Sequence, residues 1–137
     1  MNRSPKNLLA LFTVAAVVAA PLGARAEVDS ALVKQGLAAY ASLDYARAIT
    51  LLEQARRESL TREEKILTYR TLGMAYVALG QPGPAKLDFQ HLLRVDPSVE
   101  LDRSVAPKVR AVFEEAKAEA ATSANAMSGA LSTLLPA

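Results

Sequence analysis

The stretch TYRTLGMAYVALGQPGPAKLDFQHLLRVDP, residues 68–97, decides the fold of this chain. Apolar residues recur at helical spacing on both sides of the segment GQPG, residues 80–83, which is rich in residues that break helices. We expect one helix to end near Leu79 and another to start at Pro84, with Gly83 as its cap, and to stop before Pro97. The pattern therefore predicts a helical hairpin.

An earlier segment repeats this pattern at a spacing of 37 residues. The identical positions are small residues, since Gly36, Ala38 and Ala48 correspond to Gly73, Ala75 and Ala85. Glycine inside a helix costs about 1 kcal/mol relative to alanine, so both glycines are expected where a neighbouring helix approaches closely. Leu52 and Phe89 would fill the space beside these contacts. Two stacked hairpins are therefore expected, and the predicted fold class is all-α.

Helix-capping residues support the same division. Asp44 is a suitable N-cap for a helix from Tyr45 to about Arg57. Thr61 and Glu64 have the spacing of a capping box for a helix that reaches about Leu79. With a further helix after Pro97, the sequence predicts five helices.

These residues resemble the tetratricopeptide repeat (TPR) family. The second repeat, about 61–97, matches nearly every signature position of the family: Tyr69, Leu72, Gly73, Tyr76, Gly80, Ala85, Phe89 and Pro97. The first repeat, about 29–60, matches more weakly through Leu32, Gly36, Tyr45, Ala48, Leu52 and Ala55, and departs from the pattern at Ala39 and Leu60. The family spacing is about 34 residues, so the longer spacing here implies extra residues near 57–62 that lengthen the following helix.

The C-terminal part does not continue the repeat. Segment 98–106 is expected to be a linker, with Leu101 as its one sizeable apolar anchor, and Pro107 opens an amphipathic helix at 107–121 that would cap the second hairpin. Residues 95–116 also resemble the segment that follows partial TPR repeats in exported bacterial envelope proteins. Residues 122–137 carry no charge, and we expect them to form a disordered tail.

The first 26 residues have the pattern of a secretory signal peptide. Arg3 and Lys6 precede an uncharged run at 8–20, and the sequence Ala-Arg-Ala at 24–26 follows a break. Cleavage after Ala26 would leave a helical domain at 27–121 and place the protein in the periplasm or outside the cell. A bilayer-spanning helix needs about 20 apolar residues, so no stable membrane insertion is expected after cleavage.

Composition argues against several classes of function. The chain has no cysteine, which excludes thiol chemistry and disulfides. Once the three basic residues before Glu27 are set aside, 13 basic residues remain against 14 acidic ones. This balance gives no basic surface, so a nucleic-acid partner is not expected. His91 is the only histidine, and we interpret it as a solvated surface residue. The pairs Glu63–Glu64 and Glu114–Glu115 are adjacent on their expected helices, so the two carboxylates of each pair do not face each other and cannot act together as a catalytic pair. We therefore expect no catalytic residues, no metal site and no cofactor.

The TPR resemblance implies a binding face. In that family the first helix of each hairpin lines a concave groove, which here assigns partner-binding positions to Val33, Leu37, Tyr40, Arg70, Met74 and Val77. This mostly apolar face would suit an amphipathic helix or an extended segment of another envelope protein. The favoured hypothesis is a non-enzymatic adaptor or scaffold. A self-associating subunit with the groove buried in a homodimer is the alternative, and a periplasmic small-ligand binder ranks third.

Overall fold

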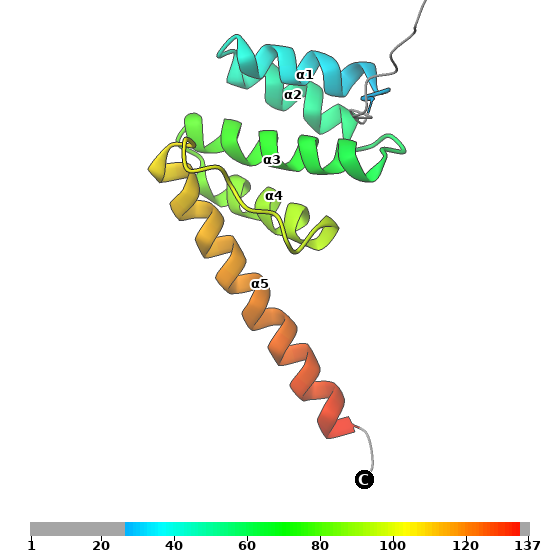
Figure 1. Cartoon of the computed structure of the whole chain (residues 1–137), viewed down its shortest axis with the longest axis vertical. Coiled ribbons are helices and arrows are strands. Elements are labelled where there is room, and N and C mark those ends of the chain that lie inside the picture. The colour runs from blue at the N-terminus through cyan, green and yellow to red at the C-terminus, as the bar shows by residue number, and fades with distance from the viewer. Residues whose placement is uncertain (1–26, 135–137) are drawn as a thin grey trace, which may run out of the picture.

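The computed structural model describes residues 27–134 as five helices, with no strand in that range. The expected signal peptide at 1–26 and residues 135–137 lie outside the described residues. Figure 1 shows the order of the elements: α1 (Ala31–Ala41), α2 (Tyr45–Ala55), α3 (Arg62–Ala78), α4 (Pro82–Val95) and α5 (Pro107–Leu134). The all-α prediction and the number of helices are confirmed.

The helices pair as two hairpins, α1 with α2 and α3 with α4, and the hairpins stack through α2 and α3 (Figure 1). The predicted caps are present, because Asp44 accepts a hydrogen bond from the backbone N–H of Arg47, and Thr61 and Glu64 form a complete capping box. Helix α4 begins two residues before the predicted start, since Pro82 lies in its first turn with Gln81 as N-cap. The extra residues do lengthen the later hairpin, because α3 has 17 residues and α1 has 11.

Both hairpins turn in the same way. Leu43 has φ 62° and Gly80 has φ 72°, so each occupies the left-handed region just after a helix end. In the first turn the backbone N–H of Asp44 donates to the carbonyl of Ala39 at 2.9 Å. In the second turn the backbone N–H of Gln81 donates to the carbonyl of Tyr76 at 2.8 Å, and each of these residues lies 37 positions after its counterpart. The repeat seen in the sequence is therefore a repeat of backbone conformation.

The two helical glycines lie at the closest approach within each hairpin. A methyl group added at Gly36 would stand 2.5 Å from Cγ of Leu52, and one added at Gly73 would stand 2.4 Å from Cε1 of Phe89. Both distances are far shorter than ordinary van der Waals contact. The expectation that these glycines allow close helix packing is confirmed.

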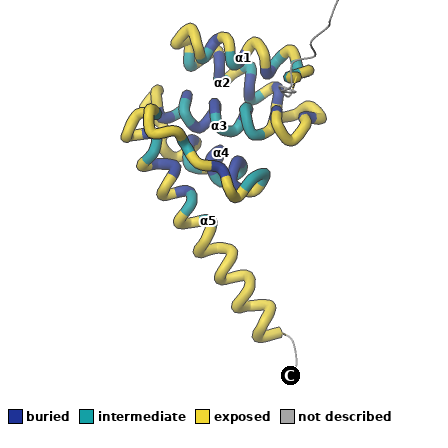
Figure 2. The backbone as a smooth tube through the Cα atoms, viewed as in Figure 1, coloured by how far each residue is buried: buried dark blue, intermediate teal, exposed yellow. Residues whose placement is uncertain are grey.

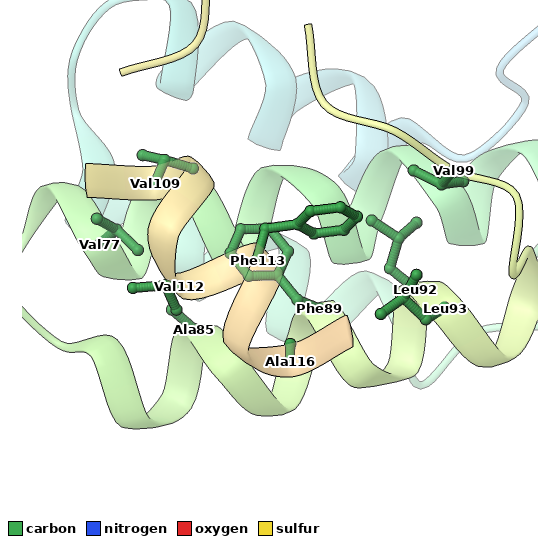
Figure 3. Close-up of a cluster of buried hydrophobic side chains, with 10 residues drawn as sticks. All are labelled: Val77, Ala85, Phe89, Leu92, Leu93, Val99, Val109, Val112, Phe113 and Ala116. Atoms are coloured by element: carbon green, nitrogen blue, oxygen red, sulfur yellow. The ribbon is translucent and has the colours of Figure 1, made fainter. Parts of the chain in front are cut away.

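The larger core cluster joins the second hairpin to the start of α5 (Figure 3). Phe89 and Phe113 meet edge to face with ring centroids 5.4 Å apart, and both are almost fully buried. The other members of the cluster are aliphatic: Val77, Ala85, Leu92, Leu93, Val99, Val109, Val112 and Ala116. A smaller cluster in the first hairpin contains Val33, Ala55 and Leu60. The expected capping of the second hairpin by the last helix is thus present.

Helix α5 has two unlike parts. Its first part packs on α3 and α4, whereas residues 121–134 are all exposed and extend away from the stacked hairpins (Figures 1 and 2). Sequence reasoning ends this helix at about 121 and expects a disordered tail, but the structure continues the helix to Leu134. No glycine or proline interrupts the sequence between Lys108 and Ser128, so the backbone has no local reason to stop at 121.

Candidate binding face

Two of the six predicted partner-binding residues belong to the core instead. Val33 is fully buried beside Ala55 and Leu60, and Val77 is 4% exposed within the larger cluster. Both side chains stabilise the helix stack and are not accessible to a partner in this structure. The assignment of Val33 and Val77 to the binding face is therefore corrected, because Val33 packs in the cluster of the first hairpin and Val77 in the cluster shared with α4 and α5.

Leu37 and Tyr40 lie on α1 and are half-buried. Leu37 packs against the smaller cluster, while the ring of Tyr40 contacts that of Tyr45, with centroids 5.4 Å apart and planes tilted by 59°. Burial, followed by the nearby Tyr45 hydroxyl, raises the pKa of Tyr40. Tyr40 therefore remains a neutral hydroxyl at neutral pH, and both residues keep part of their surface free for contact.

Arg70 and Met74 line a hollow of about 420 Å³. They lie one helical turn apart on α3, and the opposite wall is formed by residues of the connection between α4 and α5: Glu100, Leu101, Asp102 and Val105. The guanidinium Nε of Arg70 is buried and has no hydrogen-bond partner within the described part of the chain. A donor in this position would gain from meeting an oxygen atom supplied by a ligand.

The two carboxylates of this hollow are already engaged. Glu100 pairs with the ammonium group of Lys117, and Asp102 accepts a hydrogen bond from the backbone N–H of Ser104 at 2.7 Å. The side-chain and backbone hydrogen bonds from Ser104 lower the pKa of Asp102. Neither carboxylate bonds to Arg70, so its buried Nε atom keeps no partner among the described residues, and a small movement of the side chain would be needed to present it to a ligand.

The connection at 98–106 covers part of the expected groove. It crosses in front of α3 and α4 (Figure 1), with Val99 buried in the core and Leu101 and Val105 packed against the same cluster. Sequence reasoning identified Leu101 as its only anchor. The alternation of Val99, Leu101 and Val105 with polar residues was the signal for a segment that packs along one side. The space expected for the groove is thus partly filled by the chain itself.

His91 is not a fully solvated residue as predicted. Its ring stacks on that of Tyr69, with centroids 5.2 Å apart and planes 21° from parallel. Burial, then the charges of Arg94 and Arg56, lowers the pKa of His91, so the ring is neutral at neutral pH. Between residues 27 and 134 no group of three metal-ligating side chains comes together.

A partly buried polar network between the hairpins was missed by sequence reasoning. Arg56 pairs with Glu53 at 2.8 Å and with Asp88 at 3.3 Å, and the hydroxyl of Tyr76 donates to Glu53 at 3.1 Å. Burial raises the pKa of Asp88 to about 7 even though Arg56 acts in the opposite direction. Burial and the charge of Glu53 raise the pKa of Tyr76 to about 12. The network joins α2, α3 and α4 and points to a structural role.

Comparisons with known proteins add no relative. No protein-family model, no curated protein and no solved structure matches the chain. Among the helices described here, none is both long enough and apolar enough to cross a membrane.

Proposed function

We propose that this chain is a non-enzymatic adaptor or scaffold of the bacterial cell envelope that holds a segment of another envelope protein. Support comes from the TPR resemblance of residues 29–97 and from the stacked hairpins, which share one turn conformation and one close helix contact. The pattern of a signal peptide at 1–26 supports export to the periplasm. The partner then meets the folded domain after cleavage at Ala26.

The observation that carries this proposal is the hollow beside Arg70 and Met74. It combines the unpartnered Nε donor of Arg70 with apolar walls from Met74, Leu101 and Val105. A peptide backbone carbonyl or a carboxylate would satisfy the donor, while an adjoining apolar side chain would fill the hollow. Leu37 and Tyr40 add accessible surface on α1. The site therefore suits an extended, mostly apolar segment that presents one oxygen atom to Arg70.

The test replaces the residues at the hollow and measures capture of envelope proteins. Met74→Glu places a charge in the apolar hollow, and Arg70→Met removes the donor while keeping a long apolar side chain. Each change is expected to abolish capture of a specific partner from solubilised envelopes. The matched control is Leu87→Glu, which makes the same kind of change at an α4 side chain that is 59% exposed.

Circular dichroism must accompany the capture assay, because Met74 packs against the larger cluster. Variants that keep their helicity and thermal transition but lose the partner support the proposal. Capture that is unchanged in both folded variants contradicts it, because the hollow is then not the binding surface.

A further inference from the structure

The exposed half of α5 carries an apolar stripe that continues the buried face of the same helix. Ala116 is buried, Ala120 is half-buried against the larger cluster, and the next positions at helical spacing are Ala124, Met127, Leu131 and Leu134. Met127, Leu131 and Leu134 are 69%, 61% and 78% exposed. The face that packs on α4 therefore runs on beyond the hairpins without a neighbour among the described residues (Figure 2).

This segment has little reason to be a free helix in water. The segment prolongs a helix that is already nucleated by the packed first part of α5, so what decides its helicity in water is the small free energy of adding each further residue. Residues 120–134 contain Gly129 and several serine and threonine residues, and no charged side chain that could form stabilising pairs along the helix. Burial of the apolar stripe against another surface would supply the missing stabilisation.

Two adjoining hollows lie where α5 leaves the hairpins. One, of about 420 Å³, is lined by Leu93, Arg94 and Pro97 together with Lys117, Ala120, Ala121 and Ala124. The other, of about 410 Å³, is lined by Gln90, Arg94, Ala120, Ser123, Ala124 and Met127. Both hollows share Arg94, Ala120 and Ala124. The small side chains of α5 thus leave space beside α4 at the base of the exposed stripe.

The stripe is complementary to itself when two copies run antiparallel. It has alanines near the hairpins and leucines near the free end, so a twofold axis at Met127 places Ala124 opposite Leu131 of the second copy. The same axis places Ala120 opposite Leu134 of the second copy and Met127 opposite its own equivalent. Large side chains then meet small ones on either side of the axis, and the leucines enter the hollows of the other copy.

Charge also favours a second copy of this chain. The antiparallel arrangement brings the C-terminal end of one α5, with its partly negative carbonyl groups, to Arg94 of the other copy. The stripe itself carries no charge, so neither copy buries an unpaired ion. A lipid surface fits less well, because helices that lie on membranes usually carry lysine or arginine on the polar face, and residues 120–134 have none.

We propose that residues 120–134 form an antiparallel helix pair with the same segment of a second copy, making a twofold symmetric dimer. The contact is separate from the hollow at Arg70 and Met74, so the dimer leaves the proposed partner site open. Each dimer would then present two equivalent binding faces.

Single cysteines test the register, because the native chain contains no cysteine. Met127→Cys is expected to form a disulfide-linked dimer under mild oxidation. Ala124→Cys and Leu131→Cys are each expected to link poorly alone, but to link efficiently when the two variants are mixed and allowed to exchange. Asn125→Cys, on the opposite face of the helix, is the control that should not link.

The mass of the chain in solution tests the dimer itself. Sedimentation of the full chain is expected to show a reversible dimer, and Leu131→Glu with Leu134→Glu should weaken dimerisation on the order of a hundredfold by burying unpaired charges. The control adds the same two charges on the opposite face, through Asn125→Glu and Thr133→Glu, and should leave the dimer intact.

Three results would overturn the proposal. The first is a chain that stays monomeric at every concentration, including a monomer that instead binds phosphatidylcholine vesicles. The second is efficient linking of Ala124→Cys alone, which indicates parallel helices. The third is equal weakening by both pairs of glutamates. Unchanged thermal unfolding of the hairpins in all variants shows that the measurements report on the exposed segment.

Discussion

The two hairpins follow the same backbone plan but are stabilised differently. Each has a helical glycine against a large side chain, and each turns through a left-handed residue. The second hairpin packs Phe89 against Phe113 of α5, whereas the first has a small cluster and an exposed leucine, Leu43, in its turn. The comparison indicates that two repeats can share one backbone geometry although only one of them packs into a large core.

The largest expected effect comes from the closer of the two glycine contacts. Gly73→Ala would place a methyl group against the ring of Phe89, which Phe113 prevents from moving away. We expect a loss of about 2 to 3 kcal/mol in the free energy of unfolding. Gly36→Ala meets Cγ and Cδ2 of the buried Leu52, an aliphatic side chain that can adjust more readily than a ring held by a second ring, and should cost about 1 kcal/mol. Denaturant unfolding measures both.

Gly83→Ala is the control, because nothing lies within 4 Å of an added methyl group there. It should leave stability unchanged or raise it slightly. Equal losses at Gly36 and Gly73 would contradict the view that the second hairpin is the more tightly packed.

The next effect concerns the polar link between the hairpins. Glu64 is buried and accepts hydrogen bonds from the backbone N–H groups of Asp29 and Ser30 at 2.8 Å and of Thr61 at 2.9 Å. Glu64→Ala leaves these three donors without their acceptor, so a smaller but clear fall in Tm is expected. The neighbouring exposed Glu63→Ala is the control and should have little effect.

The pH dependence gives a further check on Glu64. Backbone hydrogen bonds, first from Ser30 and then from Thr61, lower the pKa of this carboxyl below its usual range. Its stabilising effect is therefore present above the ordinary pKa of a glutamate and is lost as pH falls through the lowered pKa. The difference in Tm between the native chain and Glu64→Ala should shrink in acid, and a constant difference would argue against an ionised Glu64.

Asp88 should show the opposite pH dependence. Because burial raises its pKa to about 7, the folded state favours the protonated acid, and its contribution to stability declines as pH rises from the ordinary aspartate range through 7. Asp88→Asn should therefore be about as stable as the native chain near pH 4 but more stable than the native chain at pH 8. Thermal unfolding at both pH values tests this, and a variant that is less stable at pH 8 would assign the ion pair with Arg56 a net stabilising role.

The smallest effect exchanges the turn residues. Leu43 adopts a left-handed conformation with φ 62°, and its side chain is 70% exposed, so Leu43→Gly should stabilise the first hairpin by about 0.5 to 1 kcal/mol. The reciprocal change Gly80→Leu should destabilise the second hairpin by a similar amount. A first hairpin that loses stability with glycine at residue 43 would show that the leucine makes a contact in the turn.

Local signals predicted the fold well. The capping residues, the turn at 80–83 and the glycines at 36 and 73 each act over a few residues or within one hairpin, where a sequence pattern is informative. The binding face was predicted less well, because burial of Val33 and Val77 depends on how whole helices stack. The packing of 98–106 across α3 also depends on contacts far apart in the sequence. The continuation of α5 was missed because an uncharged end was interpreted as disorder.

The hydrogen bonds of Glu64 also bear on how the domain would respond to a force that pulls on the chain before α1. Asp29 and Ser30 stand just before α1, and their backbone N–H groups are held by a side chain of α3 across 35 and 34 positions of sequence. A pull on the chain at its N-terminal side is therefore shared directly with the central helix, before α1 and α2 have to separate. We therefore expect Glu64→Ala to lower the force at which the N-terminal end of α1 separates from α3.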